Sequence, residues 1–319
     1  LLTLAGANGF GGATTVNAGS LALGANDALS DLTVLAINGG AFNVATFNDT
    51  VAGVTLVGGS LVGSTGVLTS AADFDLRAGS VSAILGGAVN VVKTTAGLVT
   101  LSGANTFTGG TNLSGGTLVA GDVGAFGTGT VNVTAGTLDL GNLAVANNVT
   151  LRGGALQNAA EYAGTATVPV GQAFNLNTDL GGTLNVLGTV DFTGGSYENL
   201  TGTGLVRRNT AGLVLDKPTS FAGTFRINAG GSVRITDANA LGTAVLDGGF
   251  KWQALATNNN DAQFLETRKF QVLEVARVWR LPPQMVGEWE RATHANAEQM
   301  GLQFLKFSLL PWLRRYESA

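Results

Sequence analysis

Short runs that alternate apolar and polar residues fill positions 1–244, and glycine-rich turns separate them. Segments such as TLDL, ALQN and TLNV place one side chain inward and the next outward, which is the period of a β-strand. Paired glycines suit the tight corners between such strands, because glycine adopts positive φ without steric cost. Proline is nearly absent, and the 3.6-residue period of a helix is missing. This part of the chain is therefore predicted to be all β.

The strands recur in a repeat. Residues 2–31 align with residues 98–129 and with residues 213–244, and each copy contains a β-branched run, a small polar turn, a phenylalanine, a glycine, a threonine and a second alternating run. The repeated aromatic and threonine positions are Phe10, Phe107, Phe221, Thr14, Thr111 and Thr224. Weaker units fill the gaps at residues 37–47, 133–142, 149–158 and 180–196. Such self-similarity is typical of a solenoid.

A single unit of this kind cannot bury its apolar face, whereas stacked units bury one another's faces. We therefore expect residues 1–244 to form a right-handed parallel β-helix, a solenoid with successive coils about 4.8 Å apart. At about 20 residues per coil, the segment gives about twelve coils and a rod of roughly 55 Å. The predicted fold class is mainly β, with the parallel β-helix followed by a small α-helical C-terminal segment.

The pattern changes near residue 244. Residues 1–244 hold 44 of the 48 glycines and 21 charged residues, whereas residues 245–319 hold 17 charged residues, all four tryptophans and the only histidine. Asp261 is predicted to cap a helix that ends near Arg280, before Pro282-Pro283. The apolar stripe of that helix is Leu265, Val272, Ala276 and Trp279.

A second helix is predicted near the C-terminus. Asn296 with Gln299 has the spacing of a capping box at its start. Pro311 is expected to kink this helix or to break it near Leu309. Its apolar positions are Met300, Phe304, Phe307, Leu310 and Leu313.

Composition narrows the classes of protein. Only 12% of residues are charged and the mean hydropathy is +0.28, which argues against disorder. The absence of cysteine excludes disulfides and thiolate metal sites. A net charge of −4 gives no reason to expect phosphate binding by the whole molecule, and the apolar runs are too short to span a membrane. The start, LLTLAGANGF, has neither Met nor a visible signal peptide, so we expect a piece of a longer reading frame.

Candidate chemistry in residues 1–244 is sparse. The segment has no histidine or cysteine, which excludes Ser-His and Cys-His nucleophile pairs there. We expect its scattered aspartates to be solvated coil residues, whereas carboxylates clustered in one groove would indicate a carbohydrate-active enzyme. Arg207-Arg208 is expected on a solvent-facing loop, with an acidic ligand as the alternative. The aspartates in question are Asp73, Asp75, Asp122, Asp139, Asp179 and Asp191.

The C-terminal segment carries the remaining candidates. Its tryptophans are expected in a core or at subunit interfaces, with stacking on nucleic acid as the alternative. His294 is expected to be structural. Lys269 and Arg314-Arg315 are expected on a charged helix face, the alternative being DNA in a channel. The tryptophans are Trp252, Trp279, Trp289 and Trp312. We assign no catalytic, metal-binding or cofactor-binding residue to the chain, and we expect no enzymatic activity.

Residues 97–121, GLVTLSGANTFTGGTNLSGGTLVAG, resemble the autotransporter-associated β-strand repeat of bacterial passenger domains. The core pattern L-x-G-x-N-x-F-x-G-x-T runs from Leu101 to Thr111. The copy at residues 213–244 departs from it, with Lys217-Pro218 where Gly103-Ala104 stands. The resemblance implies a secreted or surface-displayed β-helix, often adhesive, with a host-surface or glycan ligand along the solenoid.

Residues 245–319 resemble the C-terminal region of a tailed-phage portal protein. The resemblance lies in L-x-G-G-x-x-W at 246–252, DAQFLETRKFQ at 261–271, the proline pair, ERAT at 290–293 and LLPWLRR at 309–315. That family implies a homo-oligomeric ring at a capsid vertex, with DNA in its channel and the terminase as partner. We do not expect these partners here, because most of a portal fold has no counterpart in the chain.

We therefore expect two domains, residues 1–244 and residues 245–319. The resemblance of the first implies display on the cell surface or secretion, and the resemblance of the second implies the capsid vertex of a virion. We interpret the chain as a non-enzymatic surface rod joined to a portal fragment in a chimeric reading frame. The alternatives are a portal protein with a replaced N-terminal region and a carbohydrate-active β-helix. We expect the C-terminal helices to pack on the last coil or to stay loose.

Overall fold

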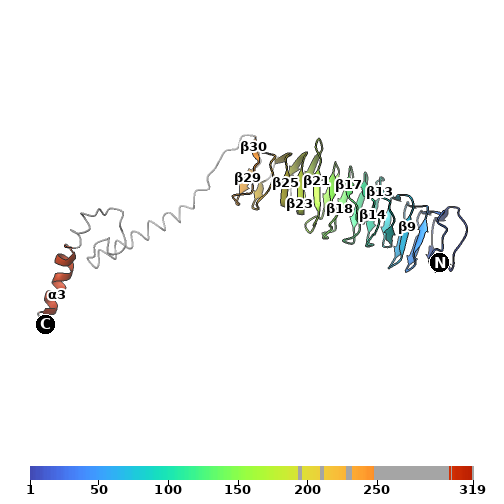
Figure 1. Cartoon of the computed structure of the whole chain (residues 1–319), viewed down its shortest axis with the longest axis horizontal. Coiled ribbons are helices and arrows are strands. Elements are labelled where there is room, and N and C mark those ends of the chain that lie inside the picture. Colours follow the sequence, from blue (N-terminus) through green and yellow to red (C-terminus); the bar gives the residue numbers. More distant parts are fainter. Residues whose placement is uncertain (193–195, 209–211, 228–231, 248–301, 303, 318–319) are drawn as a thin grey trace. The chain divides into compact units, whose positions relative to one another are not determined.

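A computed structural model describes residues 1–192, 196–208, 212–227, 232–247, 302 and 304–317. The chain divides into two compact units, Leu1–Phe250 and Lys251–Ala319. The first unit is a parallel β-solenoid of about 12 turns (Figure 1), and the C-terminus carries a short helix. The predicted fold class is confirmed. The predicted boundary at residue 244 stays a prediction, and the ladder of strands extends three residues beyond it, to Asp247.

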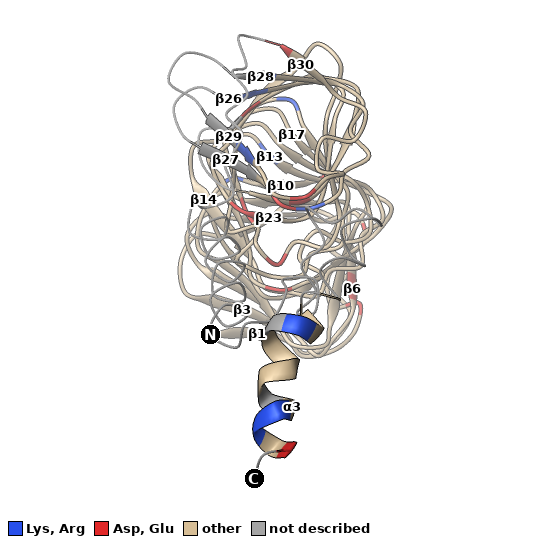
Figure 2. Ribbon diagram, turned by 90° about the vertical axis from the view of Figure 1, so that its left-hand side faces the viewer, with Lys and Arg blue, Asp and Glu red and all other residues tan. Residues whose placement is uncertain are grey.

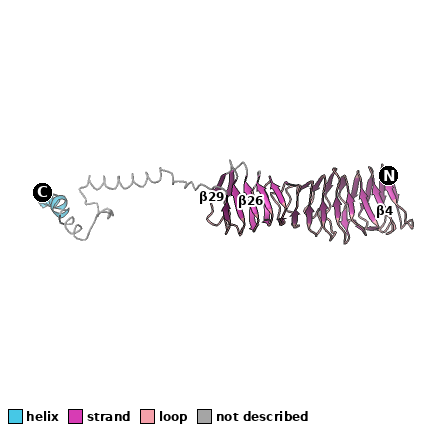
Figure 3. Cartoon of the chain, turned by 90° about the horizontal axis from the view of Figure 1, so that it is seen from above, coloured by secondary structure: helices cyan, strands magenta, loops and turns pink. Residues whose placement is uncertain are grey.

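The longest sheet has eleven strands, and every neighbouring pair is parallel. Its strands are β2 (Thr14–Val16), β4 (Val34–Ile37), β7 (Gly53–Leu56), β10 (Phe74–Leu76), β13 (Val91–Lys93), β15 (Thr111–Leu113), β17 (Val131–Val133), β19 (Val149–Leu151), β21 (Thr165–Val168), β23 (Leu180–Val186) and β25 (Tyr197–Gly202). Figure 3 shows these strands of the first unit stacked side by side in one direction.

A second face of the solenoid consists of a nine-stranded sheet and, further along the chain, a five-stranded sheet. The nine strands are β1 (Leu2–Leu4), β3 (Ser20–Leu23), β5 (Ala41–Ala45), β8 (Ser60–Gly63), β11 (Gly79–Val81), β14 (Leu98–Leu101), β16 (Thr117–Ala120), β18 (Thr137–Asp139) and β20 (Ala155–Gln157). The five are β22 (Ala173–Leu176), β24 (Thr189–Phe192), β26 (Leu205–Arg208), β28 (Thr224–Ile227) and β30 (Val245–Asp247).

Two shorter sheets complete the coils. They are the three-stranded sheet of β6 (Asp49–Val51), β9 (Val67–Ser70) and β12 (Ile84–Gly86), and the pair of β27 (Gly212–Leu215) and β29 (Ser232–Ile235). In the second unit the structure describes a π-helical segment, η2 (Phe304–Leu309), followed by α3 (Leu310–Glu317). The change of helix type at Leu309 lies where Pro311 predicts a break, because proline cannot donate to the preceding turn.

The register of the strands gives the coil length directly. Val54 pairs with Phe74 twenty residues later, and Leu118 pairs with Leu138 at the same spacing. The spacing falls to sixteen where Leu184 pairs with Leu200, and it returns to twenty-one where Arg226 pairs with Asp247. The predicted period of about 20 residues therefore holds for the middle and the last coils of the solenoid, with shorter coils between them.

Inward-facing residues of equivalent register form columns through the interior, as in-register parallel pairing requires. From β4 to β25, one column of the eleven-stranded sheet is buried throughout, and it is apolar except at Thr111. Its members are Leu35, Val54, Phe74, Val91, Thr111, Val131, Val149, Ala166, Leu184 and Leu200. The residues between them face outward, so the sheet buries one face and leaves the other to solvent.

Candidate functional site

The residues of the passenger-like motif join neighbouring coils of the solenoid. Asn105 accepts a hydrogen bond from the N–H of Leu85 (2.8 Å) one coil earlier and donates one from Nδ2 to the carbonyl of Ala125 (2.6 Å) one coil later. Phe107 is fully buried. A Cβ built on Gly109 would overlap the carbonyl of Val89 in the preceding coil. Asn105 thus joins three coils, and the motif's glycine permits their close approach.

The weaker copies of the motif keep part of this arrangement. Asn8 donates to the carbonyl of Ala28 (2.8 Å), and Thr219 donates from Oγ1 to the carbonyl of Ala240 (3.2 Å). Phe221 is buried like its counterpart in the best copy, whereas Phe10 in the first coil is 46% exposed. The predicted alignment of the three copies therefore corresponds to equivalent places in the coil.

Each of the six aspartates singled out from the sequence forms a hydrogen bond or an ion pair. Asp73 accepts from Asn90, Asp75 pairs with Arg77, Asp122 accepts from the N–H of Gly124, Asp139 accepts from the N–H of Gly141 and from Asn158, Asp179 accepts from Ser196, and Asp191 pairs with Arg207. All but the contact of Asp75 with Arg77 join neighbouring coils or close turns, which is a structural use of a carboxylate. Among the described residues, no group of three or more His, Cys, Asp or Glu could hold a metal ion.

An ionic ladder crosses the five-stranded sheet. The loop predicted for Arg207-Arg208 is wrong, because both residues belong to β26. Arg207 pairs in register with Asp191 of β24 on one side and with Arg226 of β28 on the other. Arg226 in turn pairs with Asp247 of β30. Sequence alternation could place Arg207 on a strand, but only the coil length brings these four charges into one line.

The outer two contacts of this ladder are salt bridges. Nε and one Nη of Arg207 donate to the two carboxylate oxygens of Asp191 (2.6 and 2.5 Å), in the bidentate geometry of a strong pair. This contact raises the pKa of Arg207. Arg226 donates from Nε (3.0 Å) and one Nη (2.5 Å) to one oxygen of Asp247. Asp191 is buried, whereas Asp247 is exposed.

Lys93 and Asp49 are buried titratable side chains that went unnoticed in the sequence. Lys93 is fully buried, and its Nζ donates to the carbonyls of Thr95 and Gly115 (3.1 Å for the latter), while burial lowers its pKa. Asp49 is 1% exposed, and burial raises its pKa. Lys93 follows an alternating run that points it inward, which is the one signal that could have predicted its burial.

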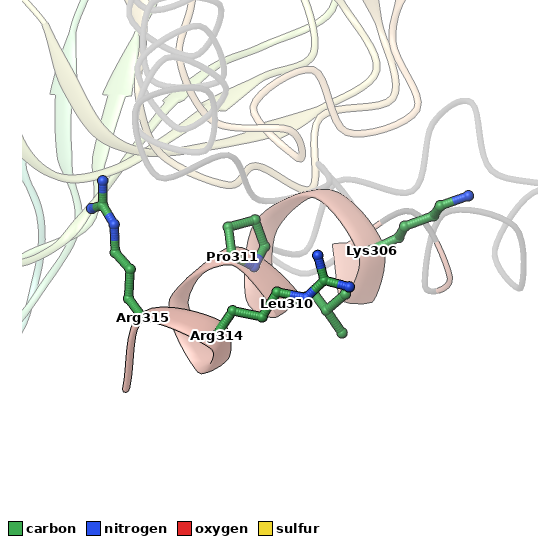
Figure 4. Close-up of a pocket in the computed structure, with 5 residues that line it drawn as sticks. All are labelled: Lys306, Leu310, Pro311, Arg314 and Arg315. Atoms are coloured by element: carbon green, nitrogen blue, oxygen red, sulfur yellow. The ribbon is translucent and has the colours of Figure 1, made fainter. Parts of the chain in front are cut away.

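In the second unit, η2 and α3 line a pocket of about 400 Å³ (Figure 4). Its lining residues are Lys306, Leu310, Pro311, Arg314 and Arg315. In Figure 4 the side chains of Arg314 and Arg315 extend in different directions. The pocket therefore has a basic lining.

Several sequence predictions lie outside the described residues. They are the helix from Asp261 to Arg280, the capping box of Asn296 and Gln299, Lys269, His294, and the tryptophans at 252, 279 and 289. Trp312 lies in α3. In the part of the chain that the structure describes, no helix is long and apolar enough to cross a membrane.

Comparisons with known proteins find two separate likenesses. The family model of the passenger-associated-transport-repeat matches residues 2–23 and 91–120, and that of the phage portal protein matches residues 213–319. Both resemblances seen in the sequence are thereby confirmed. The portal match begins inside the solenoid, since β27 to β30 lie within it. The passenger-repeat match and the parallel solenoid together support an autotransporter-like passenger.

Curated relatives match over the C-terminal part. The portal protein of Enterobacteria phage HK97 is 38% identical over 77 residues, which cover 24% of this chain and 18% of the relative. The probable portal protein of Streptomyces phage phiC31 is 38% identical over 82 residues, covering 25% and 18%. An uncharacterized protein of Rickettsia bellii is 29% identical over 89 residues, covering 28% and 23%. The chain thus spans about a fifth of the length of these relatives. No solved structure matches it.

Proposed function

We propose that the first unit is a non-enzymatic rod of the autotransporter passenger type, displayed on a bacterial surface or secreted. The second unit derives from the C-terminal part of a phage portal protein, joined to the rod in a chimeric reading frame. The observation that carries the proposal is the parallel ladder from β1 to β30, whose first half contains both passenger-repeat matches. The coils expose small polar side chains and bury the apolar ones, which suits a stalk in water.

The test of this proposal is display on a cell. Residues 1–250 replace the passenger of a characterised autotransporter, between its signal peptide and its membrane barrel, and intact cells are labelled with an antibody to an N-terminal tag. Protease added outside the cells then removes the label. We expect surface labelling comparable to that of the native passenger, which serves as the control. A rod that remains in the periplasm while the control reaches the surface contradicts the proposal.

The rod is proposed to be free of catalysis. Each of the six aspartates considered in the sequence is held by a hydrogen bond or an ion pair, which supports a structural role rather than that of a paired acid and base. Incubation with a panel of soluble polysaccharides tests this, with reducing ends as the readout. We expect no release above that of a heat-treated sample, and steady release from any substrate overturns the assignment.

A second candidate is a virion portal protein whose N-terminal region has been replaced. It is favoured by the 38% identity with two phage proteins over the C-terminal part. Native mass spectrometry of the full chain separates the two candidates, since we expect a monomer and a portal function requires a ring. A dodecamer would favour the portal protein with a replaced N-terminal region.

The origin of the fusion has its own test. DNA reads that cross the codons around residue 244 should recur in independent samples if the fusion is carried by a living genome. Their absence would identify the join as an assembly artefact.

A further inference from the structure

Charge is distributed unevenly along the solenoid. Residues 1–204 carry three Lys and Arg against eleven Asp and Glu, whereas residues 205–247 carry five against three. Figure 2 shows Lys and Arg near β26 and β28 and an acidic position at β30. The five cations of the last coils are Arg207, Arg208, Lys217, Arg226 and Arg234. A basic region on an otherwise acidic rod is the place where an anion would bind.

The order of charges in the ionic ladder sharpens this point. Asp191, Arg207, Arg226 and Asp247 occupy successive register positions. An alternating order would place each charge beside its opposite, but this order places two arginines on adjacent strands, whose backbones lie about 4.8 Å apart. Like charges directly opposite one another destabilise a sheet. An anion between the two arginines would remove that cost.

Both guanidinium groups keep donors for such an anion. Arg207 and Arg226 donate from Nε and one Nη to the flanking aspartates, which leaves Nη1 of each arginine without a hydrogen bond in the described structure. The two arginine side chains are 34% and 44% exposed. Because Asp191 and Asp247 hold the guanidinium planes from the outside, little side-chain entropy remains to be lost on binding.

We propose that Arg207 and Arg226 form an oxyanion site on the outer face of the five-stranded sheet, which binds the sulfate or carboxylate groups of an acidic polysaccharide. The site itself stands on the geometry, and the polysaccharide as its source rests on the proposed surface function. Double-stranded DNA fits less well, because it carries one charge per about 1.7 Å and the neighbouring coils are acidic. A polysaccharide with sparse charges and many hydroxyls avoids that repulsion.

The test uses the full chain and isothermal titration with inorganic sulfate, a sulfated tetrasaccharide, a neutral tetrasaccharide and a short DNA duplex. We expect the sulfated sugar to bind more tightly than free sulfate, and the neutral sugar not to bind. Arg207→Gln or Arg226→Gln should weaken both anions about tenfold, the value of one charge-assisted hydrogen bond. Arg77→Gln is the matched control, since Arg77 pairs with Asp75 of β10, and the flanking strands β7 and β13 hold no arginine.

Variants that fold poorly would obscure the result, because Arg207→Gln leaves the buried Asp191 without its cation. The double variant Asp191→Asn with Arg207→Gln keeps a neutral pair, and its thermal midpoint is measured beside its affinity. Undiminished binding by a folded double variant, or equal loss in Arg77→Gln, overturns the site. Arginine-dependent binding of sulfate with no preference for the sugar, or tighter binding of DNA, overturns the polysaccharide as the ligand but leaves the oxyanion site standing. Failure of surface display leaves these titrations unaffected, so the two proposals can fail separately.

Discussion

Replacing Asp49 by asparagine should stabilise the solenoid. Asp49 accepts a hydrogen bond from the N–H of Leu29 (3.0 Å), but its Oδ1 is buried and has no partner. Asn105 stands in the same relation to its preceding coil, and its amide nitrogen donates to the following one. An asparagine at position 49 would keep an acceptor for the N–H of Leu29 and carry no charge, so that no carboxylate charge is buried. Burying a polar group without full compensation costs about 1–3 kcal/mol, and this sets the expected gain at pH 7.

The gain should depend on pH. Burial, with a smaller contribution from the charge of Asp27, raises the pKa of Asp49 above 3.8. The folded state therefore keeps this proton to a higher pH than the unfolded chain. The contribution of protonated Asp49 to the free energy of unfolding is fully present below pH 3.8 and is lost as pH rises through the folded pKa. Asparagine does not titrate. The advantage of Asp49→Asn should consequently be small at pH 3 and reach its full value at pH 7.

Urea unfolding followed by far-UV circular dichroism measures this difference. With an m-value of about 3 kcal/mol per M, the expected gain corresponds to a midpoint shift of roughly 0.3–1 M at pH 7. Asp31→Asn is the control, because Asp31 is exposed and should show no shift at either pH. An Asp49→Asn protein that is less stable at pH 7, or that gains equally at pH 3 and pH 7, would refute the reasoning.

Two further substitutions probe the interior and the corners. Thr111 is fully buried in an apolar column with an unpaired hydroxyl, so Thr111→Val should raise the free energy of unfolding by about 1 kcal/mol, whereas Thr111→Ala should lower it, as urea midpoints would show. Gly129→Ala should lower the thermal midpoint by several degrees, because its Cβ would overlap the carbonyl of Gly109 in the preceding coil. Gly12→Ala is the control and should have little effect, because Gly12 has open space around it. Equal effects at both sites would contradict close coil packing.

The coil architecture could be predicted because it depends on local properties. Alternation in segments such as TLDL fixes which side chain faces inward, and repeated copies require stacking. The motif's glycine and asparagine were visible as a pattern, but their roles were not, since both act on the backbone of neighbouring coils about twenty residues away. Gly109 and Asn105 become intelligible only when the register is known.

The charge ladder was beyond sequence reasoning for a related physical reason. Asp191 and Arg207 are sixteen residues apart, but Arg207 and Arg226 are nineteen apart and Arg226 and Asp247 are twenty-one apart. Coil lengths that vary in this way cannot be inferred from a single average period. The loop predicted for Arg207-Arg208 failed because two adjacent charges on a strand, one of them paired across the sheet, resemble a solvated turn in sequence.

The solenoid ladder continues through β30 into the segment that the portal family model matches. Because the chain has no cysteine, a pair introduced at Thr224 and Val245, which face each other in register, gives a clean test. Adjacent parallel strands bring Cα atoms within the range of about 4.4–6.8 Å that a disulfide needs. We expect Thr224→Cys with Val245→Cys to oxidise to an intramolecular disulfide, seen by peptide mass mapping, and Thr224→Cys with Asp247→Cys to do so far less. Equal cross-linking in both pairs, or none in either, would contradict it.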